Sequence, residues 1–173
     1  MLDTCQRLLA NQYEAALCTL NTCLERCPDS AWNARAGNHP FCRVVFHTLF
    51  FADYYLGQNE ESLRGQPFHR HHAEFFGDYE ELEYREPVRL YDRADIRTYM
   101  QHCRNKARQV VAAETAATLS ARAGFEGREF SRAELHVYNI RHIQHHAAQL
   151  SPRLRLDFAE DIPWVGSGWR EKA

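Results

Sequence analysis

The chain has 173 residues, of which 45% are hydrophobic and 25% are charged, and its formal net charge is −2 at pH 7. This balance is typical of a globular domain that buries its own core, and it excludes the bulk basic charge that drives nucleic-acid binding. We therefore expect one domain over residues 1–173, with no nucleic-acid partner.

Hydropathy and the N-terminal sequence indicate where in the cell the protein is expected. No apolar run approaches the roughly 20 residues of a membrane-spanning helix. The stretch MLDTCQRLLANQYEAAL lacks the basic start, apolar run and cleavage site of a signal peptide. We expect a cytoplasmic protein that does not bind membranes, and its six cysteines, which form no CxxC pair, are expected to be free thiols.

Two helices are predicted in the first third of the chain. Residues 2–27 carry apolar side chains every three or four positions, and Pro28 ends this segment. A second helix is predicted from Pro40 to Gly57, PFCRVVFHTLFFADYYLG. Because it is apolar on nearly all sides, we expect it to be buried on most faces or to lie at a subunit contact.

Residues 58–91 are expected to form a long connection, of the kind that often serves as a lid or binding loop. This segment contains an acidic stretch, DYEELEYREP, and a histidine tract. Such tracts can bind metal, but we prefer to interpret this one as solvated. The histidines of the tract are His69, His71 and His72.

Two more helices are predicted after this connection. One spans residues 93–120, and the other begins at Ser131, where SRAE has the pattern of a capping box, with Glu134 as the capping residue. The last helix is expected to reach about Leu150, with Pro152 ending or kinking it. The remaining tail is expected to be irregular and anchored by Trp164. Four long helices joined by short links and one long loop predict an all-α four-helix bundle.

The ten histidines are the unusual feature of the composition. His142 and His146 are four residues apart, so that both imidazoles lie on one helix face and can reach one point. His142 with His145 is an alternative pair at spacing three. We prefer the first pair because it falls on a continuous polar stripe with Asn139 and Gln149, and a polar stripe in a packed helix is costly unless its groups find partners.

His47 is a candidate third ligand because it is the only imidazole of the apolar helix 40–57. Leaving it buried and unpaired would cost a few kcal/mol, roughly. A metal ion shared with His142 and His146 would satisfy it. The alternative is a core histidine hydrogen-bonded to a backbone carbonyl or a tyrosine.

Other polar residues are weaker candidates. The acidic loop could provide a base or a fourth ligand from Asp78, Glu80, Glu81 or Glu83, although a solvated surface loop is the simpler interpretation of each. Asp53, six residues after His47, is expected to face elsewhere. His39, His102 and His136 have no partner at an informative spacing, with His102 expected on the outer face of its helix and His136 off the face of His142 and His146.

Two segments together resemble the DinB/YfiT-like superfamily: FHTLFFADYYL on the second helix and HIQHHAAQL on the fourth. The resemblance implies a four-helix bundle in which His47, His142 and His146 bind a divalent ion, usually zinc or nickel, that stays open to water. Gln149 matches a later glutamine of the family, although HAAQ departs from its common HRGQ form.

The resemblance also implies a homodimer, with which the apolar second helix agrees, and an enzyme that acts on a small-molecule substrate. The reaction would be metal-dependent hydrolysis or thiol-dependent S-transfer, and the sequence names no catalytic residue beyond the ligands. The alternative is a non-catalytic, metal-stabilised helical protein of stress-response type. A nucleic-acid role is disfavoured by the charge balance.

Overall fold

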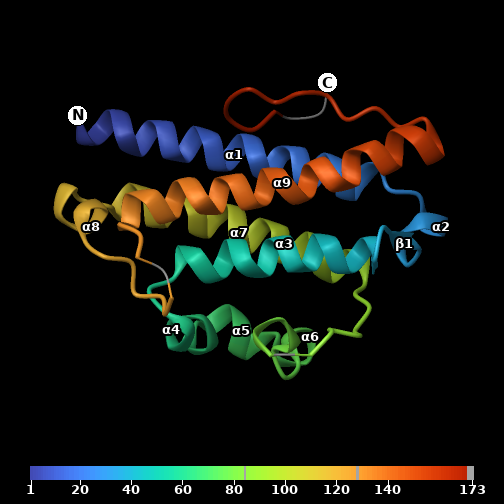
Figure 1. The fold of residues 1–173 in the computed structure, drawn as a ribbon, viewed down its shortest axis with the longest axis horizontal. Helices are drawn as coiled ribbons and strands as arrows, with labels where there is room; N and C mark the ends of the chain where they lie inside the picture. Colours follow the sequence, from blue (N-terminus) through green and yellow to red (C-terminus); the bar gives the residue numbers. More distant parts are fainter. Residues whose placement is uncertain (84, 128, 171–173) are drawn as a thin grey trace.

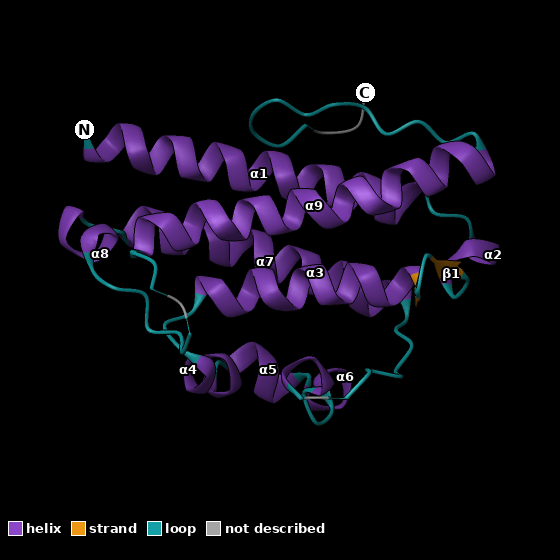
Figure 2. Ribbon diagram, in the orientation of Figure 1, coloured by secondary structure: helices purple, strands orange, loops and turns teal. Residues whose placement is uncertain are grey.

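The computed structural model describes residues 1–83, 85–127 and 129–170. Most of these residues are helical, which confirms the all-α prediction (Figure 2). The four long helices are α1 (Leu2–Arg26), α3 (Phe41–Leu56), α7 (Arg93–Ala113) and α9 (Arg132–Phe158). The short elements are α2 (Asp29–Trp32), β1 (Arg35–Ala36), β2 (His39–Pro40), α4 (Glu60–Gly65), α5 (Pro67–His71), α6 (Ala73–Phe76), the 3-10 turn η1 (Glu80–Leu82) and α8 (Ala116–Ser120).

The long helices run lengthwise beside one another (Figure 1), and α1 and α3 each contact both α7 and α9. Their inward faces are apolar and form one continuous core that includes Leu17, Leu49, Tyr99 and Ile143, all almost fully buried. The strands β1 and β2 form a small antiparallel hairpin between α2 and α3, with Arg35 opposite Pro40. Within the described residues, no helix combines the length and the apolar character needed to cross a membrane.

The connection between α3 and α7 is more ordered than the sequence predicted. It folds into α4, α5, α6 and η1, which lie along α3 on the side away from α1 (Figure 1). Phe46 of α3 stacks on Tyr91 at a centroid distance of 3.8 Å and meets Phe75 edge to face at 5.3 Å. This segment therefore covers the outer face of α3, which explains why that helix is apolar on nearly all sides.

A buried polar cluster fastens this connection to the long helices. Asp53 is fully buried and accepts hydrogen bonds from Gln66, His69 and Tyr99, and it pairs with Lys106. Burial alone would raise the pKa of Asp53, but the imidazole hydrogen bonds and the ammonium charge hold it well below its ordinary value.

The interpretation of His69 as a solvated side chain is wrong. The segment folds back onto α3, so that His69 is buried between Asp53, at 2.7 Å, and Tyr79, at 3.0 Å. His71 is exposed, as expected, and His72 stacks on Phe68 at the edge of the cluster.

Two predicted helix ends are also wrong. The third long helix ends at Ala113 rather than at residue 120, because Thr115 starts α8 with a side-chain cap on the backbone of Thr118. The last helix continues through Pro152 to Phe158. A proline removes one backbone donor, and the buried side chain of Leu154 keeps the far end of the helix on the core. The predicted start is confirmed, since the Ser131 hydroxyl caps the backbone N–H of Glu134.

The irregular tail runs back along α1 (Figure 1), but Trp164 is not its anchor. The side chain of Trp164 is 74% exposed, whereas Ile162 and Val165 are buried. Trp169 packs against the core, and the guanidinium of Arg104 lies 3.8 Å from the centre of its ring. The six cysteines are free, as expected.

Candidate metal centre

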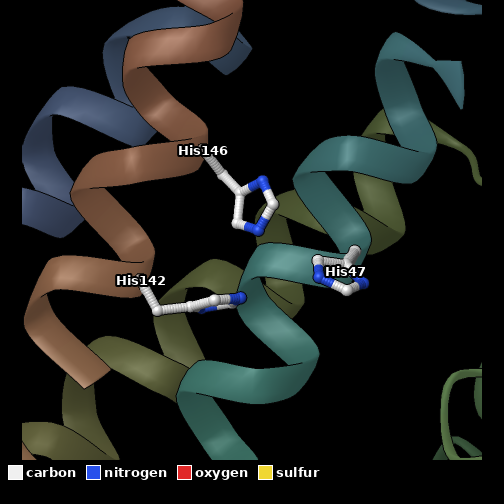
Figure 3. A group of neighbouring side chains, drawn as sticks. All are labelled: His47, His142 and His146. Carbon is white, nitrogen blue, oxygen red and sulfur yellow. The ribbon is translucent and has the colours of Figure 1, made fainter. Parts of the chain in front are cut away.

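Three imidazoles meet where α3 and α9 pack together. His47 projects from α3, and His142 and His146 project from successive turns of α9, so that all three rings point into the space between the two helices (Figure 3). One ring nitrogen from each histidine lies within 4.8 Å of the others. Among the described residues, this group contains three histidines and no carboxylate or thiol. The spacing of four on one helix and the packing of the other together form the cluster.

Two of these rings are oriented by hydrogen bonds through Nδ1. In His47, Nδ1 lies 2.6 Å from Oε2 of Glu81, and in His146, Nδ1 lies 2.8 Å from Oε1 of Gln149. Carboxylate and amide oxygens accept, so both Nδ1 atoms must carry the proton. In the neutral rings the lone pair is then on Nε2, which is the form in which a histidine binds a metal ion.

Burial favours the neutral state of one ring of the cluster, that of His146. It lowers the pKa of His146 to about 4, while the hydrogen bond to Gln149 opposes this shift and the neighbouring His47 adds to it. At neutral pH His146 is therefore uncharged and has a free lone pair. Protonated histidine cannot bind a metal, so this environment suits a ligand.

The acidic loop brings one carboxylate to the histidines. Glu81 contacts His47 with a side chain that is only 6% exposed. Glu80 is turned inward and accepts from the backbone N–H groups of Val88 and Arg89. Asp78 and Glu83 both pair with Arg85 on the outside of the loop. Of the four predicted carboxylates, the structure therefore joins only Glu81 to the cluster, as a hydrogen-bond partner of His47.

A cleft of about 260 Å³ opens beside the cluster. One wall comes from α3, with Arg43 and His47, and another from the loop that follows α6, with Glu81 and Arg85. The side chains of His146 and Gln149 complete the wall on α9. Two of the three histidines, His47 and His146, are thus accessible to a small molecule from this cleft.

A family comparison agrees with this geometry. Residues 12–150 match the sequence model of the DinB superfamily, a range that includes all three histidines and most of the chain. The chain belongs to the DinB superfamily. Comparisons with curated proteins and with solved structures find no match.

The remaining histidines of this DinB-superfamily chain lie outside the cluster. His145 is exposed and contacts Gln149 through Nε2, so the structure does not support the alternative pair of His142 with His145. Asn139, at the other end of the predicted polar stripe, is buried and donates to the carbonyl of Ala52. His39 lies at the edge of the cleft.

His136 and His102 have partners that the sequence did not reveal. His136 is buried away from the cluster, between the Tyr13 hydroxyl and the Glu114 carboxylate, each at 3.0 Å. His102 is partly buried, stacks on Phe68 and contacts Gln66, so it is not simply on the outer face of its helix. These partners come from distant segments of the chain, and no spacing along the sequence could have indicated them.

Proposed function

We propose that the protein is a metal-dependent enzyme that acts on a small molecule, using a divalent ion held by His47, His142 and His146. The observation that carries this proposal is the meeting of three imidazoles from two facing helices, two of which, His47 and His146, line a cleft. We also propose that the four long helices form the four-helix bundle of the DinB superfamily as one domain over residues 1–173.

The donor set fits a metal ion. Three neutral imidazoles suit zinc or nickel, which are the ions we propose. The hydrogen bonds from His47 to Glu81 and from His146 to Gln149 are the kind of support that fixes the ring orientation of metal-binding histidines. Structural zinc sites normally have four protein ligands, whereas catalytic sites have three and leave a position open. The three-histidine group beside a cleft therefore favours the enzyme over the non-catalytic, metal-stabilised alternative.

The reaction follows from what the surrounding side chains can do. A bound divalent ion would lower the pKa of a water molecule or of a substrate thiol. Glu81 is committed to orienting His47, and Glu80, Glu83 and Asp78 have partners of their own. Because each of these four carboxylates already has a partner, none is free to act as the base that hydrolysis would need. This favours thiol S-transfer, which needs no separate carboxylate base.

Elemental analysis of the purified protein tests the metal. We expect about one divalent ion per chain in the parent, and loss of that ion in His47→Ala and in His142→Ala. His145→Ala is the matched control, because this neighbouring histidine is exposed and outside the cluster, and it should retain the ion. A parent that contains no metal and takes up neither zinc nor nickel would refute the proposal.

Turnover assays test the enzyme. The metal-loaded protein should conjugate a small thiol to an electrophile faster than it hydrolyses model esters and amides, and His142→Ala should abolish that activity. Metal binding without either activity would favour the non-catalytic alternative.

We further propose a cytoplasmic homodimer that binds no nucleic acid. The apolar surface of α3 gives no separate support for the dimer, because residues of the same chain already cover it. Sedimentation equilibrium measures the dimer directly, and a DNA titration at low salt should give no binding.

A further inference from the structure

Arg43 lies one helical turn before His47 on α3, and both side chains line the cleft. Residues four apart on a helix share a face, so the guanidinium of Arg43 and the imidazole of His47 project into the same cleft. The Arg43 side chain is only 11% exposed. A guanidinium is charged at all ordinary pH values and offers five N–H donors, so burying it without good acceptors is costly.

The partner of Arg43 within the described residues is a weak one. Its ion pair joins Nη1 to Oε1 of Glu86 at 4.0 Å, and the Glu86 side chain is 65% exposed. The same Glu86 oxygen also lies 3.6 Å from Nδ1 of His39. An exposed, shared carboxylate at this distance contributes little and leaves most of the guanidinium donors free for a ligand.

The other charged groups of the cleft are already paired. Glu81 binds His47, and Glu83 binds Arg85. Glu80 accepts from backbone N–H groups and also lies 3.8 Å from Arg85. Among the described residues that line this cleft, Arg43 is therefore the arginine with the weakest ion pair.

We propose that Arg43 binds a carboxylate of the substrate while the substrate's reacting group reaches the ion held by the three histidines. This inference rests on the proposed function and names its substrate class. An ion held by three neutral imidazoles keeps its full charge, so the cleft would attract an anion. A carboxylate fits better than a dianionic phosphate because three glutamates line the same walls. Four residues of helix span about 6 Å, which sets a separation of a few bonds between the carboxylate and the reacting atom.

Binding of paired probes tests the inference. The zinc-loaded protein is titrated by calorimetry with 3-mercaptopropionate and with 3-mercaptopropionamide, which share the zinc-binding thiol and differ in charge. We expect the acid to bind about 10-fold more tightly than the amide, the effect of one charge-assisted pair. In Arg43→Gln the two probes should bind alike, and Arg43→Lys should recover part of the preference.

Arg85→Gln is the matched control, because Arg85 lines the same cleft but already has carboxylate partners. Its preference for the acid should stay within about twofold of the parent. Equal binding of both probes by the zinc-loaded parent would overturn the inference, whether or not Arg43→Gln folds. A preference for the acid that is lost in Arg85→Gln but kept in Arg43→Gln would also overturn it.

A second pair of probes separates this inference from the proposed function. If the protein retains no zinc, the proposed function fails. The binding of glutarate and of glutaramide to the metal-free protein is then compared, which tests the role of Arg43 without the metal. The measurement is the change in backbone N–H chemical shifts in NMR spectra. Changes near Arg43 with glutarate but not with glutaramide would support the carboxylate site, and equal changes with both compounds would refute it. If zinc is retained and the thiol probes bind equally, the metal site stands and the role of Arg43 falls.

Discussion

Oε2 of Glu81 lies 2.6 Å from Nδ1 of His47, although the two residues are 34 positions apart in the chain. The contact exists because the segment between α3 and α7 folds back over α3 and places η1 beside the histidines. This segment therefore has two roles: it covers the apolar face of α3, and it supplies the carboxylate that orients one ring of the cluster.

Removing this carboxylate should weaken metal binding without removing a ligand. We expect Glu81→Gln to lower the zinc affinity by about 10- to 100-fold, because a carboxylate partner both fixes the ring of His47 and increases its basicity. Competition with a chromophoric chelator measures the change. Glu83→Gln is the control from the same loop, and it should bind zinc within about twofold of the parent since Glu83 pairs with Arg85 instead. Equal affinities for Glu81→Gln and the parent would show that Glu81 does not support the site.

The second prediction concerns the buried cluster around Asp53. Asp53→Asn removes the charge that compensates Lys106 and replaces an acceptor of His69 by a group that also donates. Breaking a buried pair in this way costs about 3–5 kcal/mol of unfolding free energy. Urea denaturation measures it. Asp78→Asn, which breaks an ion pair on the exposed side of the loop, should cost under about 0.5 kcal/mol. A similar loss in both variants would contradict the central role of Asp53.

Patterns along the sequence were sufficient to predict the four long helices, apart from two of their ends, and to name the three histidines. A spacing of four placed His142 and His146 on one face, and a lone histidine in an apolar helix pointed to His47. The first inference uses spacing within one helix and the second uses the cost of burying an unpaired imidazole, whereas the contact between the two helices is seen only in the structure.

Contacts between distant segments could not be predicted in this way. The sequence offered four loop carboxylates and no means to choose Glu81 among them, and His69 resembled a solvated loop residue because its partner Asp53 lies 16 positions earlier on another helix. Arg43 is a different case. Its spacing of four from His47 could have been read from the sequence, but its burial and its weak pairing could not.

Acid should destabilise the fold through buried imidazoles, of which His136 is the clearest. Burial lowers the pKa of His136 despite its bond to Glu114, and the nearby Arg132 adds to this shift. Its Nδ1 accepts from the Tyr13 hydroxyl, which requires the neutral ring. Below the ordinary value of about 6.5 the unfolded chain therefore binds more protons than the folded one, so stability is complete above that pH and is lost as the pH falls.

The measurement is the unfolding free energy in urea between pH 7.5 and pH 5, with a chelator present so that metal binding does not contribute. The parent should lose stability across this range, and His136→Gln, which can still donate to Glu114 and accept from Tyr13, should lose less. The difference is at most about 1.4 kcal/mol per pH unit, the limit for one proton. A variant with the same pH dependence as the parent would show that His136 does not titrate in this way.

The last prediction separates the two tryptophans of the tail. Trp169 packs against the core beneath Arg104, a cation that also pairs with Glu14 of α1. Trp169→Ala should therefore cost about 2 kcal/mol of unfolding free energy, from lost apolar burial and the lost contact with the guanidinium. Trp164→Ala should cost under about 0.5 kcal/mol, because that side chain is 74% exposed. Urea denaturation followed by circular dichroism compares the two variants without relying on tryptophan fluorescence. A larger loss of unfolding free energy in Trp164→Ala would show that Trp169 is not the anchor of the tail.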